Sequence, residues 1–184
     1  MIRLRRILVL FCLLAVINTA NADQRLELAL AQAAQQADSF ADETVAYNWL
    51  KKMSRRLRYQ IPNPFYRTEL LRLVHQEAIR SDLPAELVMA VIQVESSFNR
   101  YAVSNVGARG LMQLMPFWIK EIGHPHDDLF NPATNLRYGC MILKNYVRQS
   151  KGNLDRALSM YHGSLQQRSY AIKVRRLMKQ LLVG

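Results

Sequence analysis

Cysteine is scarce in this chain of 184 residues, whose two cysteines are Cys12 and Cys140. Cys12 lies in an N-terminal apolar segment that we expect to be removed, so one cysteine remains and an intramolecular disulfide is excluded. Cys140 has apolar neighbours in a predicted helix, which favours a buried, inert thiol over a catalytic one. The chain must therefore rely on a hydrophobic core, and the 162 residues after Ala22 are enough to form one.

Long hydrophobic runs are also missing, apart from residues 7–17. That run follows three arginines and precedes the sequence Ala-Asn-Ala at residues 20–22, which places small residues where a signal peptidase cuts. The run is too short to cross a membrane comfortably. We therefore predict a cleaved signal peptide at residues 1–22 and a periplasmic location, with an uncleaved N-terminal anchor as the alternative.

Acidic residues are few, since 14 Asp and Glu stand against 25 Lys and Arg and give a net charge of +11. Three of the basic residues and none of the acidic ones lie within the first 22 residues, so the remainder keeps a charge of +8. Basic charge attracts polyanions in general. For an exported protein these are carboxylate-bearing wall polymers or anionic lipid, and we expect no nucleic-acid partner. A solvated basic surface without a specific partner is the simpler alternative.

No segment shows the sustained alternation of apolar and polar residues that a half-buried strand needs, and there is no repeat or low-complexity tract. Apolar residues instead recur at helical spacing, which places Val45, Ile79 and Ile172 in the predicted core. Asn131 and Asn153 precede two of the helices as capping residues. We therefore predict an all-α fold, with helices at residues 23–37, 42–58, 66–81, 84–95, 111–122, 132–149, 154–161 and 169–182.

The sequence IPNP at residues 61–64 contains two prolines that interrupt a helix, so we place a domain boundary there. Residues 23–64 form a predicted N-terminal helical extension, and residues 65–184 form a predicted single domain. The helix at 23–37 lacks a wide apolar face and is expected to attach loosely. The helix at 42–58 is amphipathic and basic, which is typical of helices that dock on a domain or lie on a membrane surface.

Glu95 is the residue around which we expect a functional site. It follows Val91 by four residues and Ile92 by three, so it continues the apolar stripe of its helix near the C-terminal end. Apolar neighbours, partial burial and the negative end of the helix dipole all raise the pKa of such a carboxyl group. A carboxylic acid that keeps its proton near neutral pH can act as a general acid, whereas an exposed glutamate at a fraying helix end cannot.

An ordered set of motifs follows Glu95. Ser96 comes next, then Ser104, then the heptapeptide GLMQLMP at residues 110–116, and finally Tyr161 close to a glycine. This order resembles the lytic transglycosylases of the soluble Slt type, which share the goose-type lysozyme fold. The resemblance extends over residues 66–174, and it implies a lysozyme-like catalytic domain, the SLT domain, within the all-α fold.

The resemblance implies cleavage of the β-1,4 bond between N-acetylmuramic acid and N-acetylglucosamine in peptidoglycan. Glu95 would protonate the oxygen of that bond, and the muramyl N-acetyl group would stabilise the cation. Glu95 would then accept the proton of the C6 hydroxyl, which leaves a 1,6-anhydro end. Glycosidases usually need a second carboxylate, but Asp127 or Asp128 is not required for this chemistry. No metal or other cofactor is implied, and the spacing of His124 and His126 matches no known zinc site.

By the same resemblance, Ser104 and Gln113 would hold the sugar and its N-acetyl group, and Met115 would line the groove. Tyr161 would bring its hydroxyl within reach of the catalytic carboxyl. His162 stands where the family usually has asparagine, so one sugar contact departs from the pattern.

Other functions fit parts of the sequence. A lysozyme-like muramidase would use water as the final acceptor, and a non-catalytic peptidoglycan-binding module would hold strands without cutting them. A basic helical nucleic-acid binder is disfavoured by the export signal. We expect a monomer that binds peptidoglycan glycan strands, and we leave open a peripheral contact with the membrane.

Overall fold

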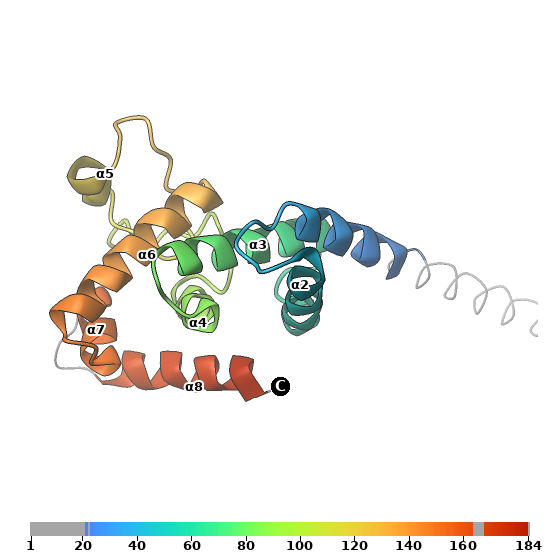
Figure 1. Ribbon diagram of the computed structural model, residues 1–184. Helices are drawn as coiled ribbons and strands as arrows, with labels where there is room; N and C mark the ends of the chain where they lie inside the picture. The colour runs from blue at the N-terminus through green and yellow to red at the C-terminus, as the bar shows by residue number, and fades with distance from the viewer. Residues whose placement is uncertain (1–20, 22, 164–167, 184) are drawn as a thin grey trace, which may run out of the picture. The chain divides into compact units, whose positions relative to one another are not determined.

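The computed structural model describes residues 21, 23–163 and 168–183, and these residues form helices and loops without a β-strand (Figure 1). The predicted all-α fold is therefore confirmed. The predicted signal peptide lies outside the described residues except for Asn21. In the described part of the chain, none of the helices combines the length and the apolarity that a bilayer crossing demands.

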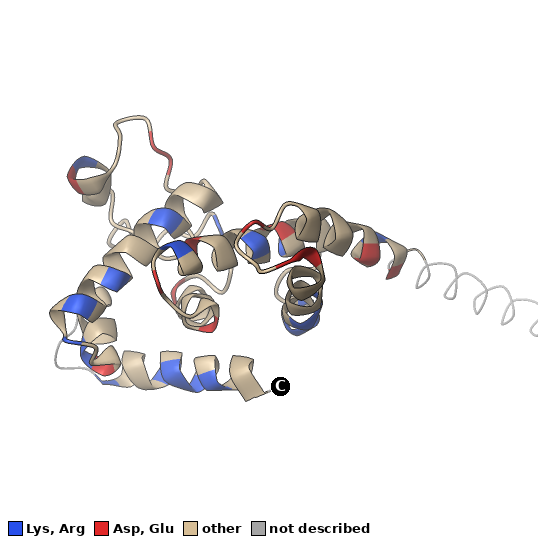
Figure 2. Cartoon of the chain, in the orientation of Figure 1, with Lys and Arg blue, Asp and Glu red and all other residues tan. Residues whose placement is uncertain are grey.

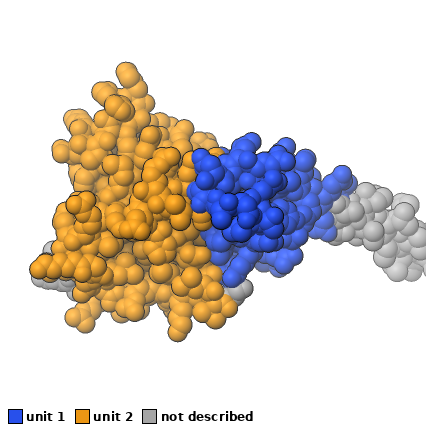
Figure 3. All heavy atoms as spheres, viewed as in Figure 1, with its two compact units in different colours: residues 1–69 blue, residues 70–184 orange. Residues whose placement is uncertain are grey.

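The chain divides into two compact units, residues 1–69 and residues 70–184 (Figure 3). Helix α3 (Pro64–Arg80) begins at the last residue of the interrupting sequence IPNP, and its residues fall on both sides of the division between the units. The boundary that we expect between residues 64 and 65 stays a prediction.

The N-terminal unit contains a helix over residues 23–35, helix α2 (Glu43–Leu57) and the start of α3. Asp42 caps α2, since its carboxylate accepts a hydrogen bond from the Val45 amide at 2.8 Å. The Val45 side chain itself is exposed, so its predicted place in the core is wrong. The buried face of α2 runs instead through residues four or three positions apart, namely Ala46, Leu50, Met53 and Leu57.

The helix over residues 23–35 is better packed than its sequence suggests. Ala29 and Leu30 are almost fully buried, and the Thr68 hydroxyl donates to the Ala29 carbonyl oxygen at 3.3 Å. Small alanine side chains allow neighbouring backbones to approach closely, so a narrow face can still be buried. The expectation of a loosely attached helix is therefore wrong.

The C-terminal unit is built around α4 (Ala85–Glu95), whose residues 87–92 are all buried. A helix that is apolar on all sides belongs in the middle of a domain. Helix α8 (Ser169–Val183) packs against α4, and α7 (Leu154–Tyr161) contacts both α8 and α6 (Pro132–Gln149). The caps predicted from the sequence are confirmed: the side chains of Asn131 and Asn153 accept hydrogen bonds from the first turns of α6 and α7.

Two predicted core residues lie on the surface instead. Ile79 is 54% exposed and Ile172 is 63% exposed. Each has a buried neighbour one or two positions away, Ala78 in α3 and Val174 in α8, so the buried face of each helix passes beside these two isoleucines. Basic residues occupy outward-facing positions of several helices, among them α2, α6 and α8 (Figure 2).

The heptapeptide at residues 110–116 is not helical, so the helix predicted over residues 111–122 is wrong in its first half. Helix α5 begins only at Phe117 (Phe117–Ile122). Before it the backbone is irregular, with Gln113 at a φ of 49° and an isolated antiparallel bridge between Arg109 and Leu114. Buried peptide groups of this loop bond to side chains of other elements, and these bonds replace the helical ladder.

Gly110 is required by the conformation and by the space around it. Its φ is 77°, in the left-handed region that favours glycine. A methyl group at this position would lie 2.3 Å from the Asn135 amide nitrogen and 2.3 Å from the Leu129 carbonyl oxygen. The packing around Gly110 therefore leaves no space for a larger side chain.

We predict that Gly110→Ala lowers the free energy of unfolding by about 3 kcal/mol, because backbone strain and overpacking add. Gly107→Ala is the matched control, since Gly107 has a φ of 86° but open space around it. It should lose only about 1 kcal/mol, from strain alone. Urea unfolding followed by circular dichroism measures both, and equal losses would contradict the packing argument.

Candidate active site

Glu95 is the last residue of α4, and its side chain is half-buried. The preceding turn of the helix supplies the fully buried Val91 and Ile92, as the apolar stripe predicts. The Tyr170 hydroxyl, from α8, donates a hydrogen bond to Glu95 Oε1 at 2.6 Å. The carboxyl group therefore lies between an apolar helix and a single strong donor.

Burial raises the pKa of Glu95 above its ordinary value, which is the direction predicted from the sequence. Two smaller influences oppose burial: the hydrogen bond from Tyr170 and the positive charge of Lys173, both of which favour the carboxylate. Burial outweighs them. The site therefore holds a carboxyl group that is easier to protonate than one in water, close to a donor that fixes its orientation.

Three side chains, from the C-cap of α4, from α6 and from α7, fix the backbone of the loop beside Glu95. The Ser96 hydroxyl donates to the Leu111 carbonyl oxygen at 2.8 Å. The Met112 amide donates to Asn135 Oδ1 at 2.8 Å, and the Tyr161 hydroxyl donates to the Met112 carbonyl oxygen at 2.8 Å. Ser96 thus orients the loop next to Glu95.

Asn135 is the most heavily used of these side chains. It is fully buried in α6, and its amide nitrogen also donates to the Arg109 carbonyl oxygen at 3.0 Å and to the Leu129 carbonyl oxygen at 2.8 Å. One amide side chain therefore satisfies three buried backbone groups of two loops. The sequence analysis missed it, although an asparagine inside an otherwise apolar helical face is a signal that could have been noticed.

The tyrosine that bonds to Glu95 is Tyr170, which the sequence analysis did not single out. We expected the Tyr161 hydroxyl to reach the carboxyl group, but it donates to the Met112 carbonyl oxygen, and Tyr170 bonds to Glu95. Burial, and then the negative charge of Glu95, raise the pKa of Tyr161 well above its usual value. The same two causes raise the pKa of Tyr170. Both hydroxyls therefore keep their protons and remain donors throughout the physiological range.

His162 joins the site through Tyr170. It is the C-terminal cap of α7 and is exposed, and its ring stacks on the Tyr170 ring with centroids 4.3 Å apart and planes 7° from parallel. Residue 162 therefore touches the tyrosine that bonds to Glu95. The departure from the family pattern falls on a residue that contacts the site.

The other predicted substrate contacts lie on the loops after α4. Ser104 is half-buried, and its hydroxyl accepts a hydrogen bond from the Ala108 amide at 3.0 Å. Gln113 is half-buried, and its amide nitrogen donates to the carbonyl oxygens of Ala102 and Gly110 at 3.1 Å and 2.9 Å. Met115 is half-buried, whereas its neighbours Met112 and Leu114 are core residues.

Asp127 and Asp128, which were considered as a second catalytic acid, accept hydrogen bonds from other residues of the protein. Asp127 accepts hydrogen bonds from the Tyr138 hydroxyl and, at 2.8 Å, from the His124 amide, and the bond from Tyr138 lowers the pKa of Asp127. Asp128 accepts a bond from the Phe130 amide at 2.8 Å. In the described part of the chain, no group of three or more His, Cys, Asp or Glu side chains is arranged to hold a metal ion. Cys140 is buried, and burial raises the pKa of its thiol, so it is an inert core residue as predicted.

Comparison with known proteins shows which protein family the chain matches. Residues 72–180 match the family described as "Transglycosylase SLT domain". A transglycosylase of Enterobacteria phage PRD1 is 36% identical over 94 residues, which are 51% of this chain and 34% of that protein. The membrane-bound lytic murein transglycosylase C of Mannheimia succiniciproducens is 40% identical over 87 residues, which are 41% of this chain and 24% of that protein. The chain thus spans about a third or less of the length of these relatives.

Among solved structures, an inactive mutant of the lytic transglycosylase Slt from Pseudomonas aeruginosa is similar. It is 22% identical, with a TM-score of 0.48, over 83% of this chain and 30% of that one.

We predict that Glu95→Gln is more stable than the wild type at about pH 7, by about 1 kcal/mol, because it removes a half-buried charge but keeps an acceptor for Tyr170. The sign follows from the raised pKa: the protonated form is favoured in the folded state, so wild-type stability falls as the pH rises through that pKa. The difference should vanish as the pH falls below the ordinary value of 4.5. Urea unfolding across this range measures it, and a variant less stable at neutral pH would contradict the burial argument.

Proposed function

Because the chain belongs to the transglycosylase SLT domain family, we propose that it is a lytic transglycosylase that cleaves the glycan strands of peptidoglycan. The observation that carries the proposal is the half-buried Glu95, with a raised pKa and a hydrogen bond from Tyr170, next to the loop held by Ser96 and Asn135. Such a carboxyl group can deliver a proton to a glycosidic oxygen.

The proposed reaction uses Glu95 twice. It first donates its proton to the oxygen of the bond between N-acetylmuramic acid and N-acetylglucosamine, while the muramyl N-acetyl group stabilises the developing cation. As a carboxylate, it then accepts the proton of the C6 hydroxyl of the same sugar, which attacks the anomeric carbon and closes a 1,6-anhydro ring. One acid is sufficient because the substrate provides its own nucleophile, whereas most glycosidases need two carboxylates.

Tyr170 is a positioning residue in this proposal. Its hydrogen bond holds the carboxyl group in one orientation and stabilises the carboxylate formed in the first step, so that the second step can follow. The substrate contacts proposed for Ser104, Gln113, Met115, Tyr161 and His162 remain those that the family resemblance implies. The hydrogen bonds of Ser104 and Gln113 to their own loops support this assignment, because they restrict these side chains before a sugar binds.

We also propose that the protein works in the periplasm after its signal peptide is removed, since that is where peptidoglycan lies. The basic residues on the outer faces of its helices fit a wall polymer that carries carboxylates. Binding as a monomer and a peripheral contact with the membrane remain predictions.

We predict that Glu95→Gln releases muropeptides from purified sacculi about a thousandfold more slowly than the wild type, because an amide cannot donate the proton. Glu121→Gln is the matched control, since Glu121 is an exposed glutamate of α5, and its rate should be unchanged. Mass spectrometry of the products gives the rates and the chemistry together.

The products also separate the competing functions. Wild-type muropeptides that end in 1,6-anhydro-N-acetylmuramic acid support the proposal, and reducing ends would identify a muramidase instead. Equal release by wild type and Glu95→Gln, at background level, would identify a binding module that does not cut.

A second prediction concerns the pH dependence of kcat/KM. The first step needs protonated Glu95, so the rate should fall as the pH rises through its pKa. The hydrogen bond from Tyr170 favours the carboxylate and lowers that pKa, so Tyr170→Phe should move the falling limb to higher pH. Its kcat should fall about tenfold, because orientation is lost. A limb that stays in place or moves to lower pH would show that Tyr170 does not act through Glu95.

A further inference from the structure

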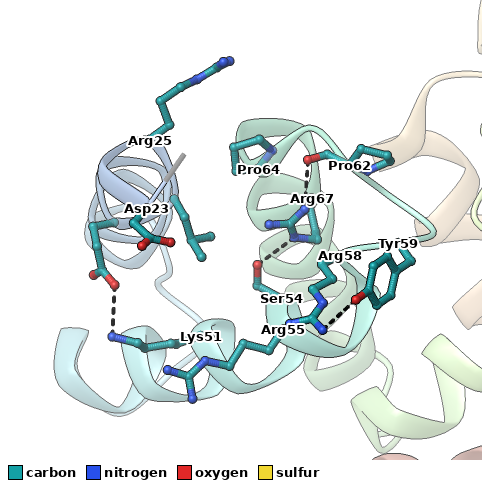
Figure 4. Close-up of a pocket in the computed structure, with 12 residues that line it drawn as sticks. Asp23, Arg25, Lys51, Ser54, Arg55, Arg58, Tyr59, Pro62, Pro64 and Arg67 are labelled. Atoms are coloured by element: carbon teal, nitrogen blue, oxygen red, sulfur yellow. Dashed lines mark hydrogen bonds and ion pairs between the residues drawn. The ribbon is translucent and has the colours of Figure 1, made fainter. Parts of the chain in front are cut away.

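The N-terminal unit contains a pocket of about 760 Å³ that the proposed reaction does not use (Figure 4). Every residue that lines it lies between positions 23 and 67, so it belongs to this unit alone. Its walls come from the helix over residues 23–35, from α2 and from the segment that leads into α3. The volume is in the range of pockets that bind small molecules.

One wall of the pocket is basic. Lys51, Ser54 and Arg55 line it from α2 and Arg58 lines it from the C-cap of that helix, and their spacing of three or four residues places them on one face. The guanidinium group of Arg58 lies over the Tyr59 ring, 4.6 Å from its centroid, and donates to the Tyr59 hydroxyl at 2.8 Å. The stacking orders the Arg58 side chain, and Arg55 lies one helical turn away on the same face.

The base of the pocket is a buried arginine that has a structural role. Arg67 is 5% exposed, and it donates to the Ser54 hydroxyl at 2.7 Å and to the carbonyl oxygens of Ile61 and Pro62 at 2.5 and 3.1 Å. These bonds join α3 to α2 and to the segment before α3. The pocket is thus formed by groups that are already held in place, which reduces the entropic cost of binding.

The opposite wall, on the first helix, carries two carboxylates, Asp23 and Glu27, and also Arg25, whose side chain points away from Asp23. Glu27 is paired within the protein: it accepts hydrogen bonds from the Tyr47 hydroxyl and, at 3.1 Å, from Lys51. These two bonds lower the pKa of Glu27, so the edge of the pocket already holds an ionised carboxylate. With Lys51 used in this way, Arg55 and Arg58 supply positive charge on one side and Asp23 supplies negative charge on the other.

We propose that this pocket binds a short zwitterionic peptide, with the peptide's carboxylate at Arg55 and Arg58 and its ammonium group at Asp23. Guanidinium groups bind carboxylates through two parallel hydrogen bonds, which favours the placement of the peptide's carboxylate at Arg55 and Arg58. The aliphatic part of the peptide contacts Leu26 and the two prolines that line the same pocket.

The stem peptides of peptidoglycan have this chemistry when they end in a diamino acid with a free ammonium group. The identification of the ligand as a stem peptide rests on the proposed function of the chain. The pocket fits an anionic membrane less well, because it is concave and Asp23 would repel lipid phosphates. The site would hold the peptide part of the wall while the site at Glu95 acts on the glycan.

The test is calorimetric titration of the full chain with a synthetic stem tripeptide that ends in a diamino acid. The Arg55→Gln/Arg58→Gln double variant should bind at least about tenfold more weakly, since charged hydrogen bonds are lost. Lys52→Gln is the matched control, because Lys52 is exposed on α2 but does not line the pocket, and its affinity should be unchanged.

A second comparison keeps the proposal testable if the double variant does not fold. Acetylation of the free ammonium group of the diamino acid should weaken binding of the peptide to the wild type about tenfold. It should leave binding to Asp23→Asn unchanged. No binding by the wild type, or equal binding by all variants, would overturn the proposal. So would a double variant that binds the peptide normally but no longer sediments with phosphatidylglycerol vesicles.

The outcome is independent of catalysis. Muropeptide release is measured on the same preparations, so a wild type that cuts sacculi but does not bind the peptide would overturn the pocket alone. A wild type that binds the peptide but cuts nothing would overturn the proposed enzymatic function and leave the pocket supported.

Discussion

Buried peptide groups in an irregular loop need hydrogen-bond partners, and this requirement organises the C-terminal unit. The segment from Arg109 to Met112 cannot use a helical ladder, so Ser96 and Tyr161 bond to its carbonyl oxygens. Asn135 bonds to a carbonyl oxygen and an amide of the same segment. Each unsatisfied group would cost about 1–3 kcal/mol. The bonds therefore fix one arrangement of α4, α6 and α7, and Glu95 lies at the end of α4 within it.

The electrostatics of Glu95 follow from that arrangement. Its helix ends inside the unit, so its carboxyl group loses part of its hydration, and its pKa rises. Tyr170 and Lys173 recover some of the lost stabilisation of the charged form without cancelling it. A group balanced in this way exchanges its proton more readily near neutral pH than a solvated glutamate, which is the property that a residue acting as acid and then as base needs.

The two units use basic residues in different ways. In the N-terminal unit, Arg67 is buried among backbone carbonyl oxygens, while Arg55 and Arg58 face a pocket. In the C-terminal unit, Lys173 acts on Glu95 through its charge alone. The basic residues that give the net charge of +11 therefore have different roles: some are structural, some line a pocket, and some act through their charge. Composition predicts an affinity for anions but cannot locate it, because location depends on which arginines the fold leaves available.

Local patterns in the sequence determined the helical class and the caps at Asn131 and Asn153, and they predicted the direction of the Glu95 pKa shift. An ordered set of motifs carried the family resemblance, which the match over residues 72–180 confirms. The helical class, the caps and the apolar stripe beside Glu95 depend on residues a few positions apart, whose relations are the same in any helix. Only the tertiary structure decided that Tyr170, 75 residues away, bonds to Glu95, that Asn135 holds the loop, and that residues 110–116 are not helical. Those outcomes depend on which buried groups meet after the helices pack, and spacing along the chain does not encode that.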